Sequence, residues 1–441
     1  MRILLAPDRF SGTLTAVEAA AALGAGWAQA APDDAVTAVA MSDGSAGLLD
    51  VVAAARGGRL VPMTVPGPLG APVPAAVLHV PGGGGGTAYV EADQAIGPHL
   101  VPEADRRRAA ERGTSAGVGH LLAAAVRTGA SRVVVGLGAA AVHDAGAGLL
   151  SVLAGGAGTA GMPSDAGADA FPSAGPGPAG TLGAGGLALA GLTPADTEAL
   201  AAVRDRLVQV DLLLAVADDA PLLGLHGAGA VLGQDPAVGP AAAQDLERAL
   251  GHATDLLERR AATLGDPRRG WALRAAAPGH EHAPRTPAPL ALADAPGRAP
   301  ATRLARRGGT GAGGGTAFLL QLLGGRVLPG ADVVADAVGL RAHVAKADLV
   351  VTGGQLLDAP SLTGSVTATV ARLAMERGLP VVVVAEEVRA SRREAAQAGI
   401  SATYEVLDRR RDGSSGKLHG AAHARDRLTV RGARVARTWS A

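Results

Sequence analysis

Short apolar runs alternate along this chain with stretches of helical periodicity, and several of the runs end in Gly and a lone Asp. Residues 2–6 form the first run, and the polar loop 8–13 follows it. Thr15 and Glu18 then fit a capping box, which predicts a helix that ends before Pro32. Continuous Val and Leu runs are typical of strands buried on both faces of a parallel sheet. The pattern therefore predicts an α/β protein with a doubly wound start.

The same pattern predicts where the other elements lie. Strands are expected at residues 35–41, 73–80, 88–91, 132–138, 208–216, 348–352 and 380–385. Helices are expected at 46–55, 115–129, 144–153, 241–264, 316–323 and 362–377. Two segments lack this pattern. Residues 155–191, rich in Gly, Ala and Pro, are expected to be a surface excursion, and 265–307, rich in Pro, Arg and Ala, a flexible insertion.

The chain has 441 residues, which is long for one core and favours two domains. Because α/β order resumes near the C-terminus, we expect a first domain built from residues 1–64 and 308–441. A second α/β domain, residues 65–307, would be inserted between these two parts.

Charge and composition narrow the range of functions. Basic and acidic residues number 40 each, and a formal net charge of zero argues against a nucleic-acid or anionic-membrane partner. The absence of Cys excludes disulfides and thiolate metal sites. No signal-peptide core and no apolar span of membrane length is found. We therefore expect a cytoplasmic protein that acts on a small molecule, with its oligomeric state left open.

Gly-rich and charged motifs have ordinary explanations as well as functional ones. Residues 309–314 fit G-x-G-x-x-G, but the preceding ARLARR is not strand-like, which argues against a dinucleotide site. A phosphate-binding loop at a helix start and a turn favoured by the Gly-rich composition both stay open. His280-Glu281-His282 is expected to be a solvated loop, and Arg409-Arg410-Arg411 a charged surface.

Carboxylates recur where predicted strands end: Asp8, Asp43, Asp144, Asp358, and either Asp218 or Asp219. Phosphoryl transfer needs carboxylates for Mg²⁺ and for the acceptor hydroxyl. A single Asp in such a place is usually a turn or cap residue. Several of them at the carboxyl ends of parallel strands favour one shared cleft.

At these segments the chain resembles the type I glycerate kinase family, whose members phosphorylate D-glycerate from ATP with Mg²⁺. The family's motifs appear in its order: D-S-F-K-G-S/T at 8–13, M-A-D-G-G-E-G-T at 41–48, T-S-x-G-V-G at 114–119, G-L-G-G-S-A-T-N-D-G-G-A-G at 136–148, D-x-x-N-P-L-L-G at 218–224 and T-G-E-G-x-x-D-x-Q-T-L-x-G-K at 352–365. The segment 218–224 is one residue shorter than the family's motif. The resemblance implies a two-domain α/β fold. In it, a Rossmann-like parallel-sheet domain is formed by both chain ends, and an active cleft is expected between the two domains. ATP and Mg²⁺ are the implied cofactors, and a glycerate-like acid is the implied substrate.

Charged and amide residues of these motifs are replaced at seven positions. Ser11 and Ser365 stand where the family has Lys, Ala46 and Gly354 where it has Glu, His143 and Ala220 where it has Asn, and Pro360 where it has Gln. Phosphoryl transfer depends on cations near the transferring group. Three hypotheses therefore stay open: a kinase for glycerate or a related hydroxy acid, a catalytically silent relative that binds a small acid, nucleotide or protein partner, and a scaffold that binds no ligand.

General kinase chemistry, rather than the resemblance, suggests a role for each candidate residue. Asp144 or Asp43 would accept the proton of the acceptor hydroxyl, and Asp218 and Asp358 would hold Mg²⁺. Thr114 and Ser115, at a helix start, would bind the substrate carboxylate. The backbone would approach the bound ligands at four glycines: Gly44, Gly136, Gly138 and Gly353.

Overall fold

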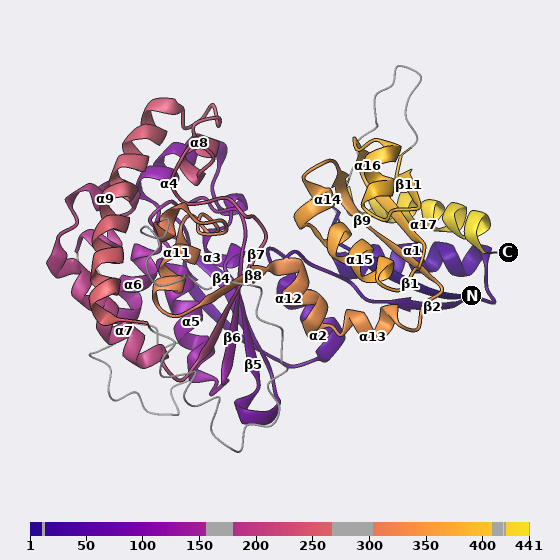
Figure 1. Cartoon of the computed structure of the whole chain (residues 1–441), viewed down its shortest axis with the longest axis horizontal. Helices are drawn as coiled ribbons and strands as arrows, with labels where there is room; N and C mark the ends of the chain where they lie inside the picture. The colour runs from indigo at the N-terminus through magenta and orange to yellow at the C-terminus, as the bar shows by residue number, and fades with distance from the viewer. Residues whose placement is uncertain (11–13, 156–179, 267–302, 408–417, 419, 441) are drawn as a thin grey trace, which may run out of the picture. The chain divides into compact units, whose positions relative to one another are not determined.

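The computed structural model describes residues 1–10, 14–155, 180–266, 303–407, 418 and 420–440 (Figure 1). The chain forms two compact units. Unit 1 consists of Met1–Gly58 and Leu328–Ala441, and unit 2 of Arg59–Val327. Each unit contains one sheet covered by helices, which confirms the predicted two-domain α/β fold.

Unit 1 is built on a parallel sheet with the strand order β11-β10-β9-β1-β2. Its strands are β1 (Arg2–Pro7), β2 (Ala35–Ala38), β9 (Leu349–Leu357), β10 (Val381–Val388) and β11 (Ala402–Glu405). Its helices are α1 (Ala16–Ala30), α2 (Leu48–Arg56), α12 (Gly330–Ala337), α13 (Leu340–Val344), α14 (Ser361–Gly364), α15 (Val366–Met375), α16 (Arg392–Gln397) and α17 (Gly420–Trp439). The predicted capping box of Thr15 and Glu18 is confirmed at the start of α1.

One face of this sheet is covered by α1 and the C-terminal helix α17, which lie against each other. Glycines make the close approach of the two helices possible. A Cβ atom at Gly26 would lie 1.9 Å from the carbonyl oxygen of Thr429, and one at Gly432 would lie 2.5 Å from that of Leu23. The pair buries an apolar surface against alternate residues of the strands, such as Ile3 and Leu5.

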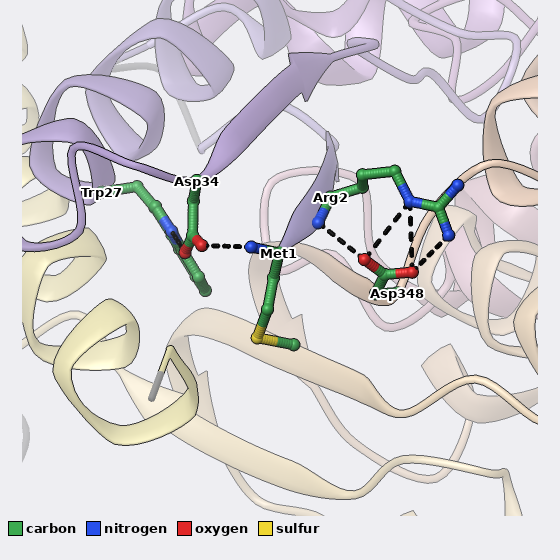
Figure 2. A network of polar contacts seen from close by, with 5 residues as sticks. All are labelled: Met1, Arg2, Trp27, Asp34 and Asp348. Atoms are coloured by element: carbon green, nitrogen blue, oxygen red, sulfur yellow. Dashed lines mark hydrogen bonds and ion pairs between the residues drawn. The ribbon is translucent and has the colours of Figure 1, made fainter.

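Polar contacts join elements at the amino end of β1 (Figure 2). The Arg2 guanidinium donates to the Asp348 carboxylate, with 2.5 Å between Nη2 and Oδ1. This contact lowers the pKa of Asp348 to about 2. On the other side, Asp34 accepts from the Trp27 indole at 2.8 Å and from the Met1 amine at 2.5 Å. These bonds stabilise the end of the sheet opposite to the carboxyl ends of the strands.

Unit 2 contains a mixed sheet with the strand order β3-β4-β5-β6-β7-β8. The strands are β3 (Arg59–Pro66), β4 (Pro72–Val80), β5 (Thr87–Glu91), β6 (Arg132–Leu137), β7 (Asp211–Val216) and β8 (Arg326–Pro329). The α-helices are α3 (Asp93–Ile96), α4 (Arg106–Arg112), α5 (Ala116–Arg127), α6 (Ala147–Gly155), α7 (Ala199–Leu207), α8 (Ala228–Leu232), α9 (Pro240–Leu264) and α11 (Thr316–Leu322). The 3₁₀ turns of the chain all lie here, at Gly83–Gly85, Pro98–Leu100, Glu103–Asp105, Thr181–Gly183, Gly186–Gly191, Pro194–Glu198 and Leu304–Arg306, as far as the structure describes it.

The sheet of unit 2 combines antiparallel and parallel pairing. The pairs β3–β4 and β4–β5 are antiparallel, whereas β5–β6 and β6–β7 are parallel. All six residues of β7 are buried, as are five of the six in β6. These two strands therefore form the centre of the core, as their continuous apolar runs predict.

The boundaries of the units differ from the expected ones. Residues 59–64 belong to unit 2 because β3 pairs with β4 along its whole length. Residues 308–327 also belong to unit 2, since α11 packs in its core and β8 is the last strand of its sheet. The boundary expected at residue 64 is therefore wrong by a few residues. The boundary expected at residue 307 is wrong by about one helix and one strand.

Some local predictions are also wrong. The strand expected at 35–41 ends at Ala38, the strand expected at 348–352 extends to Leu357, and the helix expected at 362–377 is divided into α14 and α15. Residues 180–191 are no surface excursion, because they form 3₁₀ turns whose Leu189 is buried. Residues 156–179, and the insertion between 267 and 302 with its His280-Glu281-His282, lie outside the described residues, as do Ser11 and Arg409-Arg410-Arg411. No helix that the structure describes is long and apolar enough to cross a bilayer.

Candidate functional site

The sheet of unit 1 has a topological switch point between β1 and β9. The chain leaves β1 through α1 towards β2, and it leaves β9 through α14 and α15 towards β10, on the opposite side. The connections diverge at this point and leave a crevice outside the carboxyl ends of the two strands, where open α/β sheets bind ligands. The backbone N–H of Asp8 donates to the carbonyl oxygen of Gly353 across it, at 2.8 Å.

Two carboxylates lie at this end of the sheet, Asp8 after β1 and Asp43 after β2. Burial raises the pKa of Asp8, and the negative charge of Asp43 raises it further, to about 7. Asp43 is held in place by Ser45, whose backbone N–H and hydroxyl both donate to its Oδ1, at 2.9 and 2.5 Å. With a pKa of about 7, the Asp8 carboxyl can take up or release a proton near neutral pH.

The glycines of this crevice are required by the local backbone. Gly44 has a φ of +92°, which favours glycine. Gly353 lies so close to β10 that a Cβ atom would be 1.7 Å from the carbonyl oxygen of Val384. At Gly354, by contrast, a Cβ atom would lie 3.3 Å from the Cβ of Asp8 and 3.5 Å from the carbonyl oxygen of Arg9. Residue 354 therefore borders Asp8 directly, and as a glycine it places no side chain beside that carboxylate. The expected ligand contacts of Gly44 and Gly353 stay predictions.

In unit 2, Asp144 is completely buried and accepts four hydrogen bonds. Its Oδ2 accepts from the backbone N–H and hydroxyl of Ser115, at 2.7 and 2.9 Å, and from the N–H of Gly148, at 3.0 Å. Its Oδ1 accepts from Gly146 N–H at 3.0 Å. Burial raises the pKa of Asp144, and these hydrogen bonds oppose that shift. The carboxylate joins the first turns of α5 and α6, which is a structural role, and its expected catalytic role stays a prediction.

The same contacts decide what Ser115 can bind. The backbone N–H groups at the start of a helix favour binding of a carboxylate. At the start of α5 the bound carboxylate is that of Asp144, and not that of a substrate. The Ser115 hydroxyl also accepts from Leu149 N–H, at 3.0 Å, and the residue is fully buried. It therefore has no donor left for a substrate in this structure. Thr114 is less buried, and its hydroxyl accepts from Ala116 N–H at 3.3 Å.

His143 precedes Asp144 and is 8% exposed. Its Nδ1 atom is buried without a hydrogen-bond partner among the described residues. Burial lowers the pKa of His143 to about 4, so the imidazole is neutral at physiological pH. Sequence reasoning noted the replacement at this position but had no signal that the ring is enclosed in the core.

The remaining strand-end residues of unit 2 lie in two different environments. Asp218 and Asp219 follow β7 and are exposed, and Asp218 Oδ1 accepts from Ala220 N–H at 3.0 Å. Gly136, in contrast, is a buried residue of β6 paired with strands on both sides. The carbonyl oxygen of Gly138 accepts from Gly313 N–H at 2.9 Å. Gly136 is therefore enclosed in the sheet, where a ligand has no access to its backbone.

The Gly-rich segment 309–314 packs against the core of unit 2. A Cβ atom at Gly314 would lie 1.7 Å from the carbonyl oxygen of Val142, and one at Gly313 would lie 2.8 Å from Leu137 Cδ2. Gly313 and Gly314 both have positive φ angles of 63°. These contacts explain the glycines by close packing and turn geometry, and the phosphate-binding reading stays a prediction.

Asp358 and Ser365 flank the short helix α14 of unit 1. The Asp358 carboxylate accepts from Ser361 N–H at 3.0 Å, and the Ser365 hydroxyl donates to the carbonyl oxygen of Ser361 at 2.6 Å and caps α15. Both side chains stabilise local turns. In the described part of the chain no group of three or more His, Cys, Asp or Glu residues could hold a metal ion. Asp358 as a Mg²⁺ ligand stays a prediction.

The chain is similar to known proteins over nearly its whole length. The model of the glycerate kinase family matches residues 3–440. A glycerate kinase of Bacillus subtilis (strain 168) is 30% identical over 408 residues, which cover 92% of this chain and 90% of that protein. A glycerate 2-kinase of Escherichia coli (strain K12) is 29% identical over 409 residues, covering 92% and 91%. A crystal structure assigned to glycerate kinase 2 of Salmonella typhimurium LT2 superposes with a TM-score of 0.68 at 26% identity, over 99% of this chain and 98% of that one.

Proposed function

Because this chain belongs to the glycerate kinase family, we propose that it transfers a phosphoryl group from ATP to a hydroxyl group of glycerate or a related small hydroxy acid. The observation that supports this proposal most directly is the pair of carboxylates, Asp8 and Asp43, at the switch point of the unit 1 sheet. Open α/β sheets bind their ligands at such a point, and the pair contains a group with the pKa of a base.

In the proposed reaction Asp8 is the general base. The acceptor hydroxyl gives its proton to the Asp8 carboxylate while its oxygen forms a bond to the γ-phosphorus. The bond from that phosphorus to the bridging oxygen breaks, and ADP leaves with the electron pair. A base with a pKa of about 7 is well matched to this step at neutral pH. Asp43 acts as a positioning residue, because its charge keeps the pKa of Asp8 high.

The family resemblance implies Mg²⁺, which usually binds one or two carboxylates together with substrate phosphates. Asp218 and Asp219 are consecutive exposed carboxylates at the carboxyl end of β7, so their donor atoms fit that ion. When bound there, Mg²⁺ would neutralise negative charge on the phosphates. Asp218 retains the role that its position in the sequence suggests, and Asp219 joins it.

The test is phosphoryl transfer from ATP–Mg²⁺ to D-glycerate by the purified protein and by the variant Asp8→Asn. The asparagine keeps an oxygen that can accept from Arg9 N–H, as Asp8 does at 2.7 Å. We expect turnover by the wild type and a loss of about 10²–10⁴-fold in the variant. Asp33→Asn, which changes an exposed carboxylate of the same unit, is the matched control and should retain full activity. Equal rates for Asp8→Asn and wild type would exclude Asp8 as the base.

A second candidate function is a catalytically silent family member that binds a small acid, a nucleotide or a protein partner. It is supported by the replaced positions: Gly354 places no carboxylate beside Asp8, and the Ser365 hydroxyl caps a helix. This reading predicts no turnover by a folded protein whose melting temperature rises with glycerate or ATP–Mg²⁺. Restoring the family residues, with Ser11→Lys, Ala46→Glu, Gly354→Glu and Ser365→Lys, should then produce turnover. Turnover by the wild-type protein, which lacks these family residues, would contradict the reading of a silent family member.

A further inference from the structure

A hollow with a volume of about 570 Å³ lies between α8 and α9 of unit 2. This volume is in the range of small-molecule sites. None of its lining residues has a role in the reaction described above. They come from α8 and the turn after it and from the first half of α9: Gly229, Ala230, Gly233, Gln234, Pro240, Ala243, Gln244, Glu247 and Arg248.

Small residues keep the two helices close while leaving the hollow open. A Cβ atom at Gly229 would lie 2.4 Å from Oε2 of Glu247, so a side chain there would displace the end of the glutamate. A Cβ atom at Gly233 would lie 3.4 Å from the Cβ of Ala243, at the limit of ordinary contact. A larger side chain at Gly229 or Gly233 would either move the two helices apart or occupy the hollow.

Glu247 is the one carboxylate in the lining. Its Oε1 accepts from the backbone N–H of Gly224, at 2.9 Å, which restrains the side chain. Its other oxygen, Oε2, borders Gly229. Arg248, the cation of the lining, forms its ion pair with Asp245. Within the described residues Glu247 has no ion-pair partner, so its negative charge stays uncompensated.

We propose that this hollow binds a small molecule through a primary ammonium group that donates to Glu247. An ammonium group has three donors, and a charge-assisted bond to a carboxylate is about twice as strong as a neutral one. The side-chain oxygens of Gln234 and Gln244 supply further acceptors around it. An anionic ligand is disfavoured, because the Glu247 carboxylate repels it. Since Glu247 is already oriented, little side-chain freedom is lost on binding.

The test is calorimetric titration of the full chain with two amines and their neutral analogues: ethanolamine against ethylene glycol, and cyclohexylamine against cyclohexanol. We expect saturable binding of at least one amine and none of its alcohol analogue. Glu247→Gln keeps an acceptor for Gly224 N–H but removes the charge, and should weaken binding about tenfold or more. Ala230→Leu should block the hollow.

The matched control is Ala241→Leu, an exposed position of α9 outside the lining, which should bind as the wild type does. Melting curves establish that each variant is folded. Three outcomes would overturn the proposal: no amine binds at millimolar concentration, the alcohols bind as well as the amines, or the folded Glu247→Gln and Ala230→Leu proteins both bind with unchanged affinity.

Discussion

His143→Asn tests the finding that a neutral imidazole is enclosed in the core of unit 2. In the folded protein burial lowers the pKa of His143 to about 4, whereas the ordinary pKa of an exposed histidine is 6.5. Above pH 6.5 the ring is neutral in both states and contributes nothing to the pH dependence. As the pH falls from 6.5 to 4, the unfolded chain binds a proton that the folded protein does not, and stability decreases.

The size of the effect follows from the difference between the two pKa values, which corresponds to about 3 kcal/mol. Asparagine does not titrate in this range, so its variant lacks this contribution. The stability of His143→Asn relative to the wild type should therefore rise by about 3 kcal/mol between pH 7 and pH 4. Other titrating groups, Asp8 included, are common to both proteins and largely cancel in the difference.

The assay is the melting temperature of both proteins at intervals between pH 7 and pH 4. For a domain of this size the expected relative shift is on the order of 10 °C. His226→Asn, at an exposed position of the same unit, is the control and should follow the wild-type curve. Parallel curves for wild type and His143→Asn would refute the reasoning, because they would mean that the folded protein protonates His143 as readily as the unfolded chain.

Three further predictions follow from other contacts. The rate of phosphoryl transfer should fall below about pH 7 because Asp8 must be deprotonated, and Asp43→Asn should move the midpoint of the pH–rate profile to lower pH. In chemical denaturation, Gly26→Ala should destabilise the protein by about 1–3 kcal/mol, whereas Gly24→Ala, whose Cβ would make ordinary contacts, should not. Ser115→Ala should cost about 1–3 kcal/mol in the same experiment, because it removes a donor to a buried carboxylate and the acceptor of a backbone N–H. If a variant leaves the midpoint of its pH–rate profile or of its denaturation curve unchanged, the role given to the contact that it alters is wrong.

Local signals made much of the fold predictable. The apolar runs of β6 and β7 and the capping box of α1 depend on neighbouring residues, and they lie within a few residues of where the sequence predicts them. The helix α17 was missed because the buried positions Leu428 and Val435 are separated by arginines, so its apolar face is recognisable only once α1 lies against it. The failure has a physical cause, since packing rather than propensity decides such a helix.

The candidate site was predictable in its residue types and less so in its roles. The sequence indicated carboxylates at strand ends, and the structure places Asp8 and Asp43 near each other at the switch point. It did not indicate that Asp144 is enclosed by Ser115, because the two residues are 29 positions apart in the chain. A pKa is raised or lowered by burial and by neighbours that are distant in sequence, and a local motif indicates neither of them.

By itself, then, the sequence determined the α/β class, the family and the positions of most strands, because apolar periodicity, helix caps and motif spacing are properties of consecutive residues. Only the tertiary structure decided that Gly353 is required by β10, that the start of α5 binds the chain's own carboxylate, and that Asp8 has the pKa of a base. Each of these results from segments that are distant in sequence and adjacent in space, where burial and charge act over a few ångströms and not along the chain.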